Sequence, residues 1–386
     1  MEAVNICAYA RTPVGKFRGV LSNYSAVELG SLTVKELLKR VGINPNEGSV
    51  DQIYMGQVLQ AGEGQSPARQ VALGAGMPYQ TPCTTINKVC GSSLKAVMIG
   101  ASDIRANVAE LIIAGGMESM SNSPYFIRNP LKGEDVSFSD LESILVHDGL
   151  KDAYSGEMMG NTGETVAKEF SISREQSDSF AVRSHTLAKK GWDKEWLTKE
   201  VFEVNGLSRD EGIRPETNME KLSKLRTLFN EEGQVTAGNA SQISDGASAV
   251  LIASDNATRK FNLPILAKIV DYTTSGVSPQ RVMAAPIGAV ENLLNRNNLR
   301  IEDIDIVEHN EAFASASCSV QIALKISEDR FNLHGGAIAI GHPLGATGTR
   351  CLMTLVNALE RTNGKLGIVT ICLGGGNAVA MLVERD

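Results

Sequence analysis

The sequence predicts an α/β fold made of two duplicated halves and one inserted segment. The first half contains NKVCGSSLKAV, a glycine-led helical pattern, followed by the apolar strand LIIAGG. The second half contains GGAIAIGHPLGATGTR, which again leads into a helix, followed by the apolar strand GIVTICLGGG. Each helix reaches its strand after about twenty residues, the spacing expected of a helix-to-strand step in an α/β unit. The shared layout indicates an internal duplication that brings the two helix starts together.

Both helices are predicted from the spacing of their apolar residues. Separations of three, four and seven residues place these side chains on one face, which is typical of a half-buried helix. The residues are Leu94, Val97, Met98, Ala101 and Ile104 in the first half, and Leu352, Leu355, Val356 and Leu359 in the second.

A long insertion separates two strands of the first half that directly follow each other in the second. GIVTICLGGG continues at once into AVAMLVE, whereas LIIAGG reaches its counterpart GASAVLIAS only after residues 117–245. Within the insertion, Ser173 followed by Gln176 predicts a capped helix start. An insertion of this length at a strand end is typical of a lid or substrate-binding subdomain. We therefore expect a first half formed by residues 1–116 and 246–264, an inserted domain over 117–245, and a second half over 265–386.

Composition places the chain among ordinary globular proteins. Of its 386 residues, 42% are hydrophobic and 21% are charged, and the net charge of −7 gives no electrostatic reason to expect nucleic acid. No apolar run approaches the roughly 18 residues of a membrane span, and MEAVNICAYA lacks the basic start of a signal peptide. The six cysteines show no C-x-x-C pair and no disulfide-like spacing. A reducing compartment, the cytoplasm, is therefore expected.

Cys90 is the candidate nucleophile. It stands at the start of the first helix, where unpaired N–H groups and the helix dipole favour the thiolate. A lone cysteine is more often a buried structural residue. Two downstream residues change this interpretation: His342, in a glycine-rich turn before the second helix, and Cys372, at the end of an apolar strand.

A polar turn in IDIVEHNEAFASASC supplies further candidates. His309, Asn310 and Glu311 follow a predicted strand and precede a helix. Open α/β sheets place ligand-contacting groups at the carboxyl ends of their strands. Turn and capping chemistry is the alternative interpretation of Asn310. We expect His309 to be structural or to lie on the rim.

Four ordered segments resemble the signature blocks of the thiolases: NKVCGSSLKAV, HNEAFA, GGAIAIGHPLGATGTR and CLGGGNAVA. The opening RTPVGKF, and AGNAS and DGA around Ser241 and Asp245, match as well, so that the resemblance spans essentially the whole chain. It implies a five-layered α-β-α-β-α core from two duplicated halves, with an inserted loop domain that holds coenzyme A.

The resemblance also implies a role for each candidate residue. Cys90 would store an acyl group as a thioester, and His342 would accept its proton and later bind the enolate oxygen. Cys372 would remove and return the α-proton. Asn310 would hold the water that completes the enolate's oxyanion hole. The backbone N–H groups of Cys90 and Gly374 would form a second oxyanion hole.

Coenzyme A contacts are implied by the same resemblance. Ser241 matches a serine near the pantetheine arm, Arg226 a basic residue near the nucleotide, and Met159 a methionine of the acyl pocket. Met158, however, stands where many short-chain biosynthetic thiolases have the histidine of His-Met-Gly. NKVCGSS and QISDGA depart from the usual family pattern too. These departures leave room for an acyl pocket that is not specialised for acetoacetyl-CoA.

The expected function is reversible Claisen condensation of two acetyl-CoA to acetoacetyl-CoA plus CoA. No metal or other cofactor is expected, since coenzyme A is a substrate and product. The expected partners are acetyl-CoA, acyl-CoA and CoA, with neither nucleic acid nor membrane, in a homodimer or homotetramer. The main alternative is a degradative 3-ketoacyl-CoA thiolase of broader chain length.

Two more distant alternatives stay open. A decarboxylating condensing enzyme would pair the cysteine with two histidines, or with histidine and asparagine, and Cys372 argues against it. A protein without this activity could hold a metal at Cys90, His342 and Cys372, or bind ligands as a catalytically dead homologue. Their long, glycine-flanked separations differ from the short ligand spacings of structural zinc sites.

Overall fold

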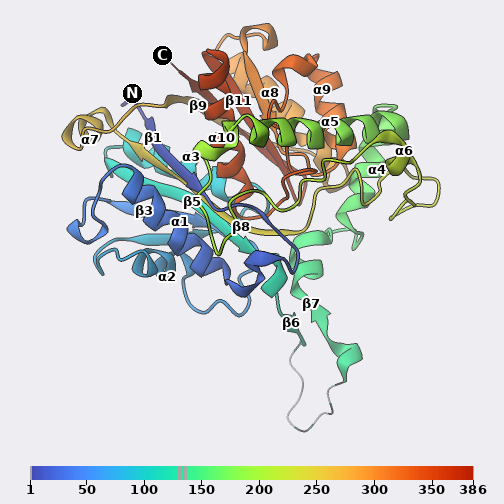
Figure 1. Ribbon diagram of the computed structural model, residues 1–386, viewed down its shortest axis with the longest axis horizontal. Helices are drawn as coiled ribbons and strands as arrows, with labels where there is room; N and C mark the ends of the chain where they lie inside the picture. The colour runs from blue at the N-terminus through green and yellow to red at the C-terminus, as the bar shows by residue number, and fades with distance from the viewer. Residues whose placement is uncertain (1, 129–132, 134, 136, 386) are drawn as a thin grey trace.

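One continuous mixed sheet runs through the molecule and joins its two halves (Figure 1). The computed structural model describes residues 2–128, 133, 135 and 137–385. The strand order is β4-β3-β5-β8-β1-β9-β12-β11-β10, with β2 also paired to β8. The strands are β1 (Asn5–Arg11), β2 (Gly15–Lys16), β3 (Gln52–Gly56), β4 (Cys83–Ile86), β5 (Leu111–Ser119), β6 (Tyr125–Phe126), β7 (Glu142–Ser143), β8 (Ser244–Ala253), β9 (Ala267–Gly276), β10 (Ile306–His309), β11 (Leu366–Leu373) and β12 (Asn377–Glu384).

The predicted duplication is confirmed by the order and direction of the strands. β3, β5, β8 and β1 of the first half lie in the same order as β10, β11, β12 and β9 of the second. In each set the first two strands are parallel and the next pair is antiparallel. The halves meet where β1 pairs with β9, at Asn5↔Lys268 and Ile6↔Ala267.

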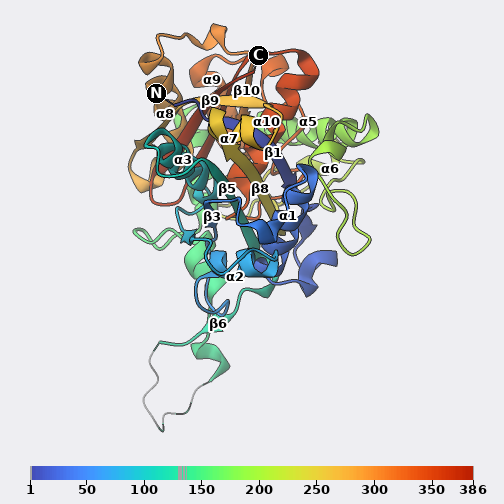
Figure 2. The ribbon, with the colours of Figure 1, turned by 90° about the vertical axis from the view of Figure 1, so that its left-hand side faces the viewer.

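Helices complete five layers. α1 and α2 cover the outer face of the first half-sheet, and α8 and α9 cover that of the second, at opposite ends of the molecule in Figures 1 and 2. α3 and α10 lie between the two half-sheets and share one apolar cluster with both. The expected α-β-α-β-α core is therefore confirmed. None of the helices in the described part of the chain is long and apolar enough to cross a membrane.

The helices have the following bounds: α1 (Ala26–Arg40), α2 (Pro67–Gly74), α3 (Ser92–Arg105), α4 (Met159–Glu169), α5 (Arg174–Asp193), α6 (Met219–Ser223), α7 (Asp255–Lys260), α8 (Ala285–Arg296), α9 (Ala314–Leu324) and α10 (Thr347–Thr362). The two amphipathic helices predicted from apolar spacing are α3 and α10. Most of α10 is buried because it is sandwiched between the half-sheets.

The insertion between β5 and β8 contains α4, α5 and α6 and the short β6–β7 pair, which lies away from the layered core (Figure 1). α5 begins at the predicted capping box, in which Gln176 N donates to Ser173 Oγ at 3.1 Å and Ser173 N donates to Gln176 Oε1 at 2.7 Å. α4 and α5 both pack on α9, which brings the insertion onto the second half.

Glycines allow the starts of α3 and α10 to touch through their backbones. A Cβ atom on Gly348 would lie 2.3 Å from Leu94 N, at the start of α3. Thr349 N also donates to Ser93 Oγ at 3.0 Å across this contact. The loop before α10 also approaches β5 closely, because a Cβ atom on Gly116 would lie 2.0 Å from Gly345 O. The expected meeting of the two helix starts is thus confirmed, and it needs residues without a side chain.

We expect Gly348→Ala to destabilise the protein by about 1–3 kcal/mol or more, because the new Cβ would force two backbone segments apart. The midpoint of thermal unfolding measures this effect. Gly288→Ala is the matched control, since it is the same change inside a helix where the nearest atom lies at 3.7 Å. The control should be neutral or stabilising by up to about 1 kcal/mol. Equal midpoints for the two variants would contradict the close contact.

Candidate active site

Cys90 lies in a strained turn between β4 and α3. The preceding residue, Val89, has φ +47°, which is rare for a β-branched residue. The turn is held by Val89 N, which donates to Asn87 Oδ1 at 3.0 Å, and by Ser92 Oγ, which donates to Val89 O at 2.6 Å. Such strain is often found next to functional groups, and here it sets the direction of the Cys90 side chain.

Burial controls the chemistry of the Cys90 thiol. Removal from water raises its pKa to about 12, and the nearby Glu118 contributes in the same direction. The backbone N–H groups of Cys90 and Gly374 hydrogen bond to the sulfur and oppose this shift only in part. The N–H groups at the helix start thus favour the thiolate, but desolvation outweighs them and the net shift of the pKa is upward. The thiol needs a base to react.

His342 can supply that base. It lies in the loop before α10, where its Nε2 is 3.3 Å from Asn310 Nδ2 and its Nδ1 is 2.7 Å from Thr347 Oγ1. Burial lowers its pKa to about 3, and the positive charge of Arg350 contributes. The imidazole is therefore neutral at physiological pH and can accept a proton.

Cys372 lies at the end of β11, buried beside Cys90. Its Sγ donates a hydrogen bond to Met283 Sδ at 3.6 Å, from the short helix η7 (Pro279–Ala284). Burial raises the pKa of the Cys372 thiol, and the neighbouring Cys90 adds to the shift. Once deprotonated, this thiol would be a strong base.

The glycine turn after β11 shapes the same place. Gly376 has φ +84°, and a Cβ atom there would lie 2.3 Å from Val277 O. Gly375 also has a positive φ, of +85°, whereas Gly374 does not, and a Cβ atom on Gly374 would lie 3.3 Å from Val89. The need for glycine is therefore greatest at Gly375 and Gly376, which bend the chain so that Gly374 N–H faces Cys90.

The three reactive side chains line one small cavity. Its volume is ≈60 Å³, and Cys90, His342 and Cys372 share it with the sequence-predicted residues Met159 and Ser241. The rest of the wall is apolar or backbone, from Gly149, Leu150, Val282, Met283, Ala312, Phe313, Leu344, Leu373 and Gly374. Asn310 is not in the wall but contacts it through His342.

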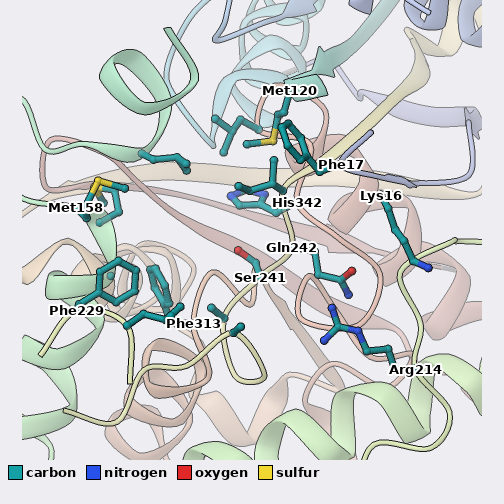
Figure 3. Close-up of a pocket in the computed structure, with 18 residues that line it drawn as sticks. Lys16, Phe17, Met120, Met158, Arg214, Phe229, Ser241, Gln242, Phe313 and His342 are labelled. Carbon is teal, nitrogen blue, oxygen red and sulfur yellow. The ribbon is translucent and has the colours of Figure 1, made fainter. Parts of the chain in front are cut away.

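A larger outer pocket of ≈430 Å³ leads to this cavity. The two share six lining residues: Leu150, Met159, Ser241, Phe313, His342 and Leu344. Figure 3 shows His342 and Ser241 in its middle, with Met158, Phe229 and Phe313 on one side and Lys16, Gln242 and Arg214 on the other. The outer pocket therefore has one apolar side and one polar, positively charged side.

Two cations that the sequence did not single out line the outer pocket. Arg226 is exposed and lies outside the lining of both cavities, although Leu228 and Phe229 next to it line the outer one. Lys16 and Arg214, which sequence reasoning missed, line the outer pocket instead. The motif RTPVGKF pointed to the segment of Lys16 but did not indicate where its side chain would lie.

Of the three polar residues at the end of β10, Asn310 contacts the site, whereas His309 and Glu311 are structural. His309 is fully buried, its Nδ1 is 3.0 Å from Ser317 Oγ, and burial lowers its pKa to about 3. It is therefore structural and does not lie on the rim. Glu311 accepts hydrogen bonds from Ser184 Oγ at 2.6 Å and Asn332 Nδ2 at 2.9 Å. These bonds fix the loop that leads to His342.

Glu118 is a buried carboxyl group that sequence reasoning also missed. It accepts hydrogen bonds from Val58 N at 3.1 Å, Leu59 N at 3.0 Å and Gly345 N at 2.8 Å. Burial raises its pKa to about 7. Because these donors come from both halves, Glu118 ties the loop after β3 to the loop that carries His342.

The family models and the curated relatives that match this chain indicate one enzyme family. The family model "Thiolase, N-terminal domain" matches residues 4–256, and "Thiolase, C-terminal domain" matches residues 263–385. A probable acetyl-CoA acetyltransferase of Escherichia coli K12 is 42% identical over 394 residues, and an acetyl-CoA acetyltransferase of Pseudomonas aeruginosa is 40% identical over 395 residues. Both alignments cover 100% of this chain and 100% of the relative.

Solved structures agree with this result. Acat5 thiolase from Ascaris suum in complex with coenzyme A superposes with a TM-score of 0.93 at 37% identity, covering 100% of both chains. The Bacillus anthracis acetyl-CoA acetyltransferase gives 0.95 at 34% identity, covering 100% of this chain and 99% of the other.

We expect Asn310→Asp to raise the pKa of His342 by about 1–3 units, because a carboxylate beside Nε2 stabilises the imidazolium. Activity should then fall as the pH is lowered through the new pKa, since a protonated His342 cannot accept a proton. Imidazole NMR titration measures the shift. His185, whose pKa burial lowers to about 4, serves as an internal control and should not move. An unchanged His342 pKa would contradict the contact with Asn310.

Proposed function

Because the chain belongs to the thiolase family, we propose that it is an acyl-CoA acetyltransferase that reversibly condenses two acetyl-CoA to acetoacetyl-CoA and CoA. The observation that carries this proposal is the convergence of Cys90, His342 and Cys372 in one cavity of ≈60 Å³. A nucleophile, a neutral imidazole and a second thiol are the groups that this two-step reaction requires.

The first step is acyl transfer to Cys90. Its thiol proton passes to His342 Nε2 while the sulfur attacks the thioester carbonyl carbon of acetyl-CoA. The negative oxygen of the tetrahedral intermediate is stabilised by the N–H groups of Cys90 and Gly374, and removing one such donor typically costs about 10²–10³ in rate. The bond to the CoA sulfur then breaks, and that sulfur takes the proton from His342. The products are acetyl-Cys90 and CoA.

The second step forms the carbon–carbon bond. The Cys372 thiol first gives its proton to His342 Nε2, and the resulting thiolate removes an α-proton from a second acetyl-CoA. The Nε2–H group of His342 and a water on Asn310 stabilise the enolate oxygen. The enolate carbon attacks the acetyl group, the bond to Cys90 breaks, and the proton on His342 Nε2 passes to the Cys90 sulfur, so that all three groups are neutral again. Asn310 Oδ1 is buried without a partner among the described residues, which supports a water position there.

The size of the inner cavity favours a short acyl group. Val282, Met283 and Leu373 line this cavity of ≈60 Å³ but not the outer pocket, so that apolar side chains leave little space beyond the reacting carbonyl. This observation favours acetyl transfer over the alternative of a degradative enzyme of broad chain length.

Coenzyme A would occupy the outer pocket. The segment 117–245, which we propose as an inserted coenzyme A domain, contributes Met159 and Ser241 to both cavities. Arg226, beyond the apolar side of that pocket, is our candidate for the nucleotide end. A homodimer or homotetramer and a cytoplasmic location complete the proposal.

The central test is acetylation of the enzyme. Brief incubation with acetyl-CoA, acid quench and peptide mass spectrometry should find an acetyl group on Cys90, because His342 lies in the same cavity to take its proton. Cys83 and Cys351 are internal controls and should stay unmodified. Acetylation of either one with Cys90 bare would overturn the assignment of the nucleophile.

Cys372→Ala should separate the two steps. Condensation should fall by at least about 10²-fold, the contribution of a general base. Acetylation of Cys90 should remain measurable, whereas His342→Ala should impair both steps. Cys318→Ala is the matched control, because this buried cysteine in α9 lies outside both cavities. If Cys372→Ala condensed at the normal rate, the division of roles would be wrong.

Arg226→Ala should raise the KM for acetyl-CoA about two- to fivefold, the effect of losing an exposed ion pair, with little change in kcat. Transfer from a truncated pantetheine thioester, which lacks the nucleotide, should be unaffected. Lys224→Ala, at an equally exposed position two residues away, is the control. Equal losses with both substrates would mean that Arg226 supports the fold instead.

A further inference from the structure

We propose that Thr347 is a positioning residue that keeps the single proton of neutral His342 on Nδ1 and leaves Nε2 as the base. The inference rests on the proposed role of His342 in accepting the Cys90 proton. It concerns a side chain that touches neither cavity and acts only through the imidazole.

The hydrogen bonds of Thr347 define the direction of the contact. Its Oγ1 donates to Pro343 O at 2.9 Å and lies 2.7 Å from His342 Nδ1. A hydroxyl has one hydrogen to donate, and here it goes to Pro343 O, which also accepts from Ala346 N and Thr347 N, both at 3.0 Å. Toward His342, the hydroxyl can therefore only accept, and Nδ1 must carry the proton.

The other ring nitrogen gives the same answer independently. Asn310 Nδ2 lies 3.3 Å from His342 Nε2, and an amide nitrogen can only donate. Nε2 must therefore present its lone pair. Since burial keeps the ring neutral, it carries one proton, and both neighbours place that proton on Nδ1.

Thr347 is held rigidly enough to impose this choice. It is fully buried at the first position of α10, and its backbone N also donates to Pro343 O, at 3.0 Å. Two bonds from one residue to one carbonyl oxygen, together with a β-branched side chain, restrict rotation about χ1. The hydroxyl hydrogen is thus already engaged before His342 changes its protonation state.

The tautomer decides whether the first step can occur. With hydrogen on Nδ1, the Nε2 lone pair takes the proton from the Cys90 thiol, and the resulting imidazolium keeps its Nδ1–H bond to Thr347. With hydrogen on Nε2, the ring would present an N–H group and could not accept that proton. Without the hydroxyl, the Nδ1–H form would leave a buried donor unpaired, so that the other tautomer competes.

The test compares Thr347→Val, which removes only the hydroxyl, with Thr347→Ser, which retains it. Rapid-quench mass spectrometry measures the rate of Cys90 acetylation by acetyl-CoA from pH 7 to 9. At pH 7 we expect the valine variant to be slower by about 10–100-fold, part of what a general base contributes, and the serine variant to be within about threefold of wild type. The KM for acetyl-CoA should be unchanged, because Thr347 lines neither cavity.

The pH dependence distinguishes a tautomer defect from a general structural defect. In the valine variant the Cys90 thiol must lose its proton to solvent before it can react. The acetylation rate should therefore rise about tenfold per pH unit below the pKa of Cys90. The wild-type rate should be nearly level over this range. Thr349→Val is the matched control, because Thr349 is a buried threonine on the same helix whose hydroxyl donates to Ser248 O at 3.2 Å. This variant should keep the wild-type pH profile.

A second measurement needs no folded valine variant. The ¹⁵N NMR signals of labelled histidine in the wild-type protein, assigned by their loss in His342→Ala, report which ring nitrogen carries hydrogen. Protonated Nδ1 is expected, and a protonated Nε2 would overturn the proposal. So would a valine variant with the wild-type rate and pH profile, or a serine variant as impaired as the valine variant. If wild type were not acetylated on Cys90, the proposed function would fail, while the NMR result would still decide the tautomer.

Discussion

The backbone contact between the starts of α3 and α10 is the constraint on which the rest of the structure depends. A Cβ atom on Gly348 would lie 2.3 Å from Leu94 N across this contact. Beside it, the loop before α10 approaches β5 equally closely, since a Cβ atom on Gly116 would lie 2.0 Å from Gly345 O. Cys90 stands just before one helix and His342 just before the other. Because the two helices touch through their backbones, the loops that carry Cys90 and His342 lie side by side. Side chains between the helices would separate the Cys90 thiol from its base.

Burial of the three reactive side chains makes their neutral forms the stable ones before substrate binds. Burial raises the pKa values of Cys90 and Cys372 and lowers that of His342, so that no group carries a charge before substrate arrives. During the reaction protons then move between neighbouring atoms. Each fixed N–H donor stabilises negative charge more strongly here than it would in water. The strained turn at Val89 and the glycine turn after Cys372 direct the N–H groups of Cys90 and Gly374 toward the Cys90 sulfur.

Buried ion pairs hold the insertion against this core. Arg11 in β1 contacts Glu200 at 2.9 Å and Asp210 at 2.6 Å, both of which belong to the insertion. Glu200 also accepts from Thr354 Oγ1 at 3.1 Å and Asn357 Nδ2 at 3.0 Å, on α10. Leaving any of these buried charges unpaired would be costly, so the network fixes where the insertion lies on the helix that follows His342. The outer pocket is formed between segments placed in this way.

Local patterns in the sequence were enough to determine the elements and their duplication. Apolar spacing identified α3 and α10, Ser173 and Gln176 marked the start of α5, and the parallel layout of the halves indicated the five-layered core. The tertiary structure alone decided the protonation state of Cys90, the burial of His309, and the presence of Lys16 and Arg214 in the outer pocket. The physical reason is that hydrogen-bonded elements depend on near neighbours in the chain. Desolvation and the meeting of distant side chains depend on packing, which no short stretch of sequence encodes.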